Sequence, residues 1–210
     1  MNRNLSRTFF VGAVLALGLQ QAVAADSGFI ESMPQLKPDP DRAGAMIWEK
    51  PGLNRAAYTS VMLEPITIFI SPDSEYKGLK PDELKKMADS FHEAVTKTLQ
   101  PDIAVVDKGG PGVLYVRAAL TDVKVAKKKR GLLGYTPIGF VATSVAGPTI
   151  LLKDAVLEIE ALDSANNERL FVLVDMAPKT AAGKELTWDE VNKTFLYYAE
   201  RFKARMQAAK

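Results

Sequence analysis

Two stretches of this sequence each carry one apolar stripe at helical spacing, and a chain with two such stripes must bury both against another layer. In residues 81–99, Pro81 suits the first helical position, and Pro101 confirms the end of the helix. The apolar stripe of this stretch consists of Leu84, Met87, Ala88, Phe91, Val95 and Leu99. In the last stretch, Thr187 and Glu190 form a capping box before a second stripe. That stripe consists of Val191, Phe195, Tyr198, Phe202 and Met206. We expect two amphipathic helices that share one core.

Apolar and alternating segments outside these helices predict β-strands. They cover residues 60–70, 103–106, 113–125, 154–162 and 170–176. The last two segments should form a hairpin, and Pro65 should sit at a bulge or on a free edge because it has no N–H to donate. We therefore expect an α+β two-layer sandwich of about five mainly antiparallel strands. Both helices should lie on one face, in the order β-α-β-β-β-β-α.

Residues 25–58 form an extended lead-in before this domain, which we place at 59–210. Four prolines interrupt any helix there: Pro34, Pro38, Pro40 and Pro51. Trp48 argues against a simple linker, because a linker would hardly carry such a large apolar side chain. Several predicted strands are apolar on both faces, so the second face of the sheet needs a cover. Either the lead-in around Trp48 or another chain must supply it.

The first 24 residues have the parts of an export signal. Arg3 and Arg7 make the start positive, and an uncharged apolar run covers residues 9–19. Ala22-Val23-Ala24 supplies a small-residue cleavage site. The run is too short for a membrane-spanning helix, which needs about 20 apolar residues. We therefore expect cleavage after Ala24 and a periplasmic mature chain.

The composition narrows the possible chemistry. The chain has no Cys and one His, which rules out disulfides, a thiol nucleophile and a lipid anchor on Cys, and makes a transition-metal site improbable. A structural role is expected for His92. Removing residues 1–24 takes away two arginines and no acidic residue, so basic and acidic residues balance and no general attraction to nucleic acid remains. No nucleophile elbow or phosphate-binding glycine loop occurs, and we expect no cofactor and no catalytic residue.

A basic cluster followed by an uncharged apolar segment is the least usual feature of the chain. Residues 127–130 are all basic, and segment 131–152 has no charged residue. In one interpretation, the basic side chains meet anionic head groups while apolar side chains enter the membrane boundary or dock on a partner. In the other, the basic run is solvated and the apolar segment is a buried crossover to the next strand. The candidate contact residues are Lys127, Lys128, Lys129, Arg130, Leu132, Leu133, Tyr135, Phe140 and, from the lead-in, Trp48.

Four carboxylates gather on the predicted hairpin: Glu158, Glu160, Asp163 and Asp175. Alternating acidic residues are typical of the solvent-facing side of a half-buried strand, and we expect that position for them. Paired carboxylates also perform glycoside hydrolysis and bind Ca²⁺, so a hydrolase using Glu160 and Asp163 stays open as an alternative.

Several short sequences follow one another along nearly the whole mature chain. They are Asp26-Ser27-Gly28-Phe29, Pro34-x-Leu36, Asp41-Arg42-Ala43-Gly44, Trp48, Pro51, Tyr58, Val61-Met62-Leu63-Glu64-Pro65-Ile66, Gly112 to Asp122, Pro137-Ile138-Gly139 and Ala155-x-x-Glu158-x-Glu160-x-x-Asp163-Ser164. In this order they resemble the bacterial family catalogued as domain of unknown function 3313. The resemblance implies an envelope protein, often a lipoprotein, and transfers no catalytic residues. This chain departs from the lipoprotein pattern because it lacks the Cys, which favours a soluble periplasmic form.

Taken together, these features favour a non-enzymatic binding module of the bacterial periplasm. Its partner would be an envelope protein or a peptidoglycan or lipid component, not a nucleic acid, and a homo-oligomer is compatible with the sequence. Two alternatives remain: peripheral membrane attachment through segment 127–152, and a carboxylate-dependent hydrolase.

Overall fold

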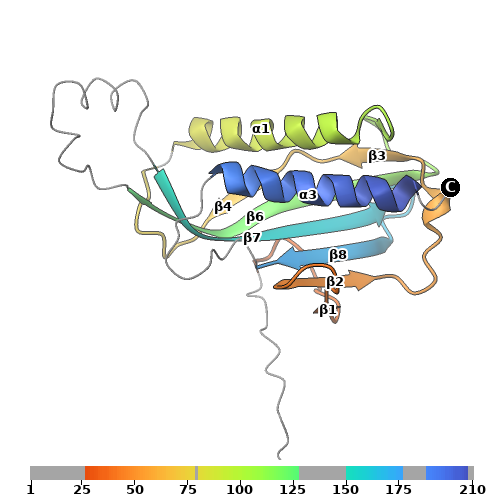
Figure 1. Cartoon of the computed structure of the whole chain (residues 1–210), viewed down its shortest axis with the longest axis horizontal. Helices are drawn as coiled ribbons and strands as arrows, with labels where there is room; N and C mark the ends of the chain where they lie inside the picture. The colour runs from red at the N-terminus through yellow and green to blue at the C-terminus, as the bar shows by residue number, and fades with distance from the viewer. Residues whose placement is uncertain (1–26, 79, 128–149, 177–187, 208–210) are drawn as a thin grey trace, which may run out of the picture.

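The computed structural model describes residues 27–78, 80–127, 150–176 and 188–207. The predicted export signal lies outside these residues, as does the capping residue predicted for the last helix. Figure 1 shows two long helices side by side over one face of a twisted sheet. Within the described part of the chain, no helix combines the length and apolar character needed to cross a membrane.

The two helices form where the sequence carries the two apolar stripes. Helix α1 spans Pro81–Leu99, as the sequence predicts, and helix α3 spans Trp188–Gln207. Phe91 of α1 stacks on Phe195 of α3, with ring centroids 5.2 Å apart. Each helix therefore packs against the other as well as against the sheet below, and both contribute to one core.

Among the described residues, the sheet contains eight strands in the order β1-β2-β8-β7-β6-β3-β5, and β4 pairs with β6 beyond that path. The strands are β1 (Lys37–Pro38), β2 (Ala45–Glu49), β3 (Ser60–Leu63), β4 (Thr67–Ile70), β5 (Ala104–Val105), β6 (Val113–Lys127), β7 (Ile150–Asp163) and β8 (Arg169–Asp175). A short 3₁₀ helix, η1 (Arg55–Ala57), joins the lead-in to β3. The predicted hairpin of β7 and β8 is confirmed as an antiparallel pair.

The α+β class and the helix layer are confirmed, whereas the sheet has more strands than the five or so predicted and is mixed, with parallel as well as antiparallel pairs. Strand β3 runs parallel to β5 and β6, and β4 runs parallel to β6. The reason is α1, which follows β4 and returns the chain to the start of the sheet, so the strands on its two sides point the same way. The single strand expected over 60–70 is divided into β3 and β4, because Pro65 cannot continue the ladder of N–H donors.

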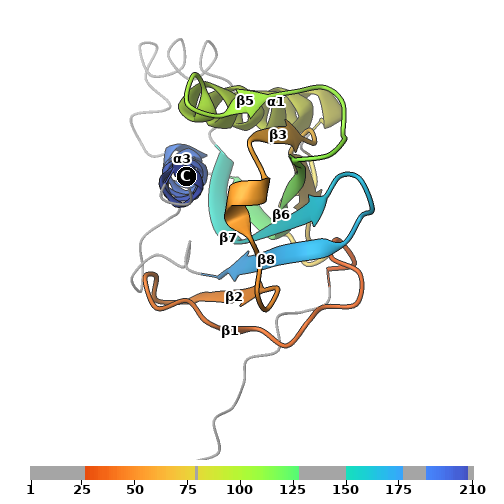
Figure 2. The same cartoon turned by 90° about the vertical axis from the view of Figure 1, so that its right-hand side faces the viewer.

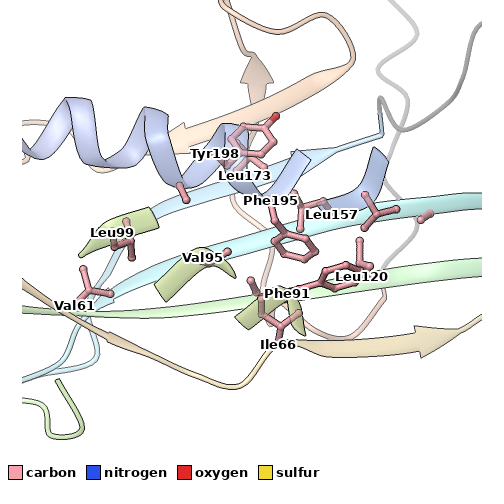
Figure 3. Packing of buried hydrophobic residues seen from close by; sticks show 14 of the residues in the cluster. Val61, Ile66, Phe91, Val95, Leu99, Leu120, Leu157, Leu173, Phe195 and Tyr198 are labelled. Atoms are coloured by element: carbon pink, nitrogen blue, oxygen red, sulfur yellow. The ribbon is translucent and has the colours of Figure 1, made fainter. Parts of the chain in front are cut away.

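The main core lies between the helices and the sheet. Figure 3 shows the stripe residues Phe91, Val95 and Phe195 in one cluster with the strand residues Leu120 and Leu157. All five are buried, with at most 9% of their surface exposed. This is the face on which both helical stripes are removed from water, which is the dominant favourable term in folding.

The lead-in covers part of the second face of the sheet. Of the two covers that the sequence allowed, the lead-in around Trp48 or another chain, the lead-in is therefore the one found. Strand β2 of the lead-in pairs antiparallel with β8 and extends the sheet on that side. Ile30 is buried against Val172 and Val174 of β8, and Trp48 packs against the same cluster. Figure 2 shows β1 and β2 continuing the sheet beyond β8. The lead-in is thus an integral layer of the fold, and two of its segments are strands.

Candidate functional site

An apolar cavity of about 140 Å³ lies between the helices and the sheet, at the end where α3 finishes. Its walls come from α1, α3 and the helix-facing side of strands β3, β6, β7 and β8. Val95, Leu114, Ile159, Leu173 and Phe195 are among the apolar residues that form them. Native cores are close-packed and contain few voids larger than a water molecule. A space of this size therefore needs a physical cause.

Small side chains at three wall positions account for the space. Ala118 of β6, Ala161 of β7 and Ala199 of α3 all line the apolar cavity, and each is buried. At these positions the helix and the strands face one another with methyl groups, so no long side chain reaches across the gap. The cavity is consequently a feature of the side-chain pattern within a regular backbone.

The turn that contains η1 closes one side of the apolar cavity. Leu53, Arg55 and Tyr58 line it from this turn, which lies across the end of the sheet beside the C-terminal end of α3 (Figure 2). The Tyr58 hydroxyl donates to Asp163 Oδ2 over 2.8 Å. Burial, followed by this bond, raises the pKa of Tyr58 to about 12. Tyr58 therefore stays protonated as a donor and anchors the turn to the β7–β8 hairpin.

Four charged residues form the rim of the apolar cavity: Glu49, Arg55, Arg201 and Arg205. The Arg55 guanidinium donates to both oxygens of Glu49, over 2.6 and 2.7 Å. Glu49 and Arg55 side chains are 30% and 42% exposed, so this part of the rim faces solvent. A space with apolar walls and a solvated charged edge can take up the apolar part of a molecule whose polar part stays at the surface.

The remaining rim residues, Arg201 and Arg205, lie one helical turn apart on α3. Arg201 donates to both oxygens of Asp39, whose side chain is fully buried, and to Asp41 over 2.6 Å. The hydrogen bond from Arg201 lowers the pKa of Asp39 below its usual value and raises that of Arg201. Arg205 reaches Asp41 only at 3.5 Å, and its side chain is 34% exposed. The lead-in is thus fastened to α3 through Arg201, while Arg205 is only loosely held.

A second buried contact fastens the lead-in next to the cavity. Asp175, at the end of β8, accepts from Arg42 Nε over 2.5 Å and from the Tyr198 hydroxyl over 2.8 Å. The Arg42 guanidinium also lies 5.0 Å from the ring centroid of Tyr197 and 5.4 Å from that of Tyr198. Burial raises the pKa of Tyr198, so its hydroxyl remains a donor. We call Asp39, Arg42, Asp175, Tyr198 and Arg201 the lead-in latch.

The acidic residues of the hairpin do not face solvent, and that prediction is wrong for three of them. Glu158, Glu160 and Asp175 are at most 3% exposed. Glu160 accepts from Arg169 Nε over 2.6 Å and from Arg117 over 3.1 Å. Arg169 also donates to the backbone oxygens of residues 31 and 32 of the lead-in. The lead-in thus contacts Arg169, one of the two arginines that compensate the buried charge of Glu160, as a buried ion requires.

The two carboxylates considered for a hydrolase have different partners. Glu160 is held between Arg117 and Arg169, whereas Asp163 accepts from the backbone N–H of Ala165 and from Tyr58, each over 2.8 Å. These bonds lower the pKa of Asp163. Neither side chain lines the apolar cavity. In the described ranges, no cluster of three or more His, Cys, Asp or Glu side chains is arranged to hold a metal ion.

Most of the contact residues predicted from the sequence fall outside the described part of the chain. Lys127 is the last residue of β6, and its side chain is not described. The others outside it are Lys128, Lys129, Arg130, Leu132, Leu133, Tyr135 and Phe140. Trp48 is described: it packs in the cluster of the second face, away from the apolar cavity.

The residues of the cavity and its rim were not predicted as a site. A sequence signal for them does exist, because Arg201 and Arg205 flank the apolar stripe of the last helix with helical spacing. The alanines at 118, 161 and 199 give no such signal, since alanine is common in any buried strand or helix. Ala118 and Ala161 come close through the register of β6 and β7, and Ala199 joins them from α3 through the packing of the helix on the sheet.

Comparison with known proteins places the chain in a family. The family described as "Protein of unknown function (DUF3313)" matches residues 25–202, and the chain belongs to it. No curated protein matches the sequence.

Two solved structures show a distant likeness. Both are of the PelC dodecamer from Paraburkholderia phytofirmans, one of them a single-residue variant. Each is 10% identical in sequence to this chain, and each match covers 78% of this chain at a TM-score of 0.33. The matches cover 95% and 96% of the PelC chains.

Proposed function

We propose that this DUF3313 protein is an exported binding module of the bacterial envelope that holds the apolar part of a small ligand in the apolar cavity. The observation that carries the proposal is the cavity itself, about 140 Å³ of space inside an otherwise buried core. An apolar cavity of about 150 Å³ stays dry and binds benzene. The size and walls of this one therefore suit a ring or part of an alkyl chain.

The positions of the carboxylates favour binding over hydrolysis. Acid–base hydrolysis needs two carboxyl groups that flank one bond, about 5 to 9.5 Å apart. Glu160 is fully engaged by Arg117 and Arg169, and the oxygens of Asp163 accept from Tyr58 and a backbone N–H. Both groups support the fold where they stand, whereas the apolar cavity has no such structural use.

Binding is tested directly with a neutral apolar ligand. Octan-1-ol should bind to the purified protein in calorimetric titration, and Ala161→Leu should abolish the binding because the larger side chain occupies the cavity. Ala104→Leu makes the same change at an exposed position of β5 outside the cavity, and should bind octan-1-ol like the wild type. Thermal melting confirms that each variant is folded. Absence of octan-1-ol binding to the wild type, or equal binding by Ala161→Leu, would contradict the proposal.

Export is tested by fractionation of cells that carry the full-length chain. Mass spectrometry of the mature protein should give a chain that begins at Ala25 in the periplasmic fraction. A chain that keeps residues 1–24 in the cytoplasmic fraction would refute this part of the proposal and leave the binding part to be judged separately.

A further inference from the structure

The charged residues around the apolar cavity are unevenly divided by sign. Three arginines, Arg55, Arg201 and Arg205, line it together with one acidic residue, Glu49. All other described lining residues are uncharged. A molecule whose apolar part fills this cavity must therefore place its other end among guanidinium groups, which present several N–H donors in a planar fork.

The three arginines differ in how much of their hydrogen-bonding capacity is used. Arg55 is paired in a fork with Glu49, and Arg201 is held by Asp39 and Asp41. Arg205 has a single ion pair in the described part of the chain, to Asp41, and its 3.5 Å separation is longer than a normal hydrogen bond. Arg205 is thus the rim cation whose donors are available to a ligand.

We infer that the ligand of the apolar cavity is a single-chain amphiphile with an anionic head group, and that Arg205 binds this head group. This inference rests on the proposed function, because it requires the chain of the ligand to occupy the cavity. A carboxylate or a phosphate ester can accept two parallel N–H bonds from one guanidinium. The same head can replace the distant contact of Arg205 with Asp41, whose side chain is 60% exposed and can turn to solvent.

Three features of this end of the molecule oppose an anion, and the first is Glu49, which lines the apolar cavity and is paired with Arg55. The C-terminal end of α3 carries the equivalent of about half a negative charge, which falls off within the last turn. Asp41 adds a negative charge that Arg201 already offsets with a 2.6 Å bond. Against these stands the guanidinium group of Arg205, whose contact with Asp41 is 3.5 Å long, so its charge is the least compensated at the rim.

The experiment compares ligands with one chain length and different heads. Octanoate, octyl phosphate and octan-1-ol are titrated into the wild-type protein at pH 7 by calorimetry. Octanoate or octyl phosphate should bind at least about tenfold more tightly than octan-1-ol, the factor expected from one charge-assisted hydrogen bond. The stronger of the two anions identifies a carboxylate or a phosphate head.

Two variants locate the head group. Arg205→Gln should remove the preference for the anions over octan-1-ol. Its fold should survive, because Arg205 is only half-buried and its one ion pair is long. Lys97→Gln is the matched control: Lys97 is a cation near the end of α1 that pairs with Glu93 in solvent and does not line the cavity. This variant should retain the full preference.

The outcomes separate this inference from the proposed function. If octan-1-ol binds as tightly as both anions, or if Arg205→Gln keeps the preference, the anionic head group is refuted while the cavity remains a binding site. If none of the three ligands binds, the proposed function itself fails.

Discussion

Replacing Ala118 with valine tests whether the space beneath the helices is a true cavity. Ala118 lines the space from β6 and is 6% exposed. Valine adds two carbons, and each buried carbon contributes about 0.8 kcal/mol. The gain should therefore be about 1.6 kcal/mol in the free energy of unfolding. This gain is smaller than the destabilisation of about 3 kcal/mol that a cavity of 140 Å³ causes in a core, so filling part of the cavity can supply it.

The neighbouring residue provides the control. Ala119 is fully buried on the opposite face of the same strand and does not line the cavity. Ala119→Val should destabilise the protein by about 1 to 3 kcal/mol, because it forces two carbons into a packed region. Urea denaturation gives both values. In thermal melting, Ala118→Val should raise the midpoint by about 3 to 6 °C for a chain of this size.

Whether Ala118→Val raises or lowers the free energy of unfolding decides whether the space beneath the helices is empty. If Ala118→Val destabilises the protein as much as Ala119→Val, the space is already filled by its own walls. The argument from small side chains at 118, 161 and 199 would then be refuted, and the proposed binding function would lose its physical basis.

Four further predictions concern the lead-in and the basic segment. Asp39→Asn should lower the free energy of unfolding by about 3 kcal/mol in urea titration, because it breaks a buried ion pair with Arg201. The control is Lys85→Gln, which removes a solvent-exposed ion pair and should cost less than about 0.5 kcal/mol in the same titration. The fold lowers the pKa of Asp39, so this carboxylate stabilises the protein fully above its ordinary pKa of 3.8, and the stabilisation is lost as the pH falls through its pKa in the folded state. The loss of stability in acid should therefore be less steep in Asp39→Asn than in the wild type. An unchanged steepness would contradict the role given to the pair of Asp39 and Arg201. Trp48→Ala should lower stability by about 2 to 4 kcal/mol if the ring serves packing, and a change near zero would support a role in partner contact instead. Replacing residues 127–130 with serine should weaken salt-sensitive binding to anionic vesicles, and equal binding by the variant would end the membrane hypothesis.

The helices could be predicted from the sequence because each depends on a local pattern. The stripe from Leu84 to Leu99 and the flanking prolines determine α1 without reference to the rest of the chain. The β7–β8 hairpin is equally local, since a short polar turn joins two apolar runs. Both predictions are confirmed.

The sheet order and the candidate site depend on contacts between distant residues. The parallel pairing of β3 and β4 with β6 follows from the return of the chain through α1, which single-strand patterns do not contain. Glu160 has the alternation of a solvent-facing residue, yet Arg117 and Arg169 bury it with the lead-in. Partners 43 and 9 positions away decide its environment. The cavity arises in the same way, from alanines on three separate elements.

The most direct test of a ligand site between the helices and the sheet is methyl NMR of the full chain during titration with octanoate. The methyl signals of Leu53, Val116 and Leu170, which line the apolar cavity, should shift with increasing ligand and saturate together. Signals of Val172 and Val174, which face the other side of the sheet, should stay unchanged. Shifts confined to Val172 and Val174, or no saturable shift at any of these residues, would contradict the account.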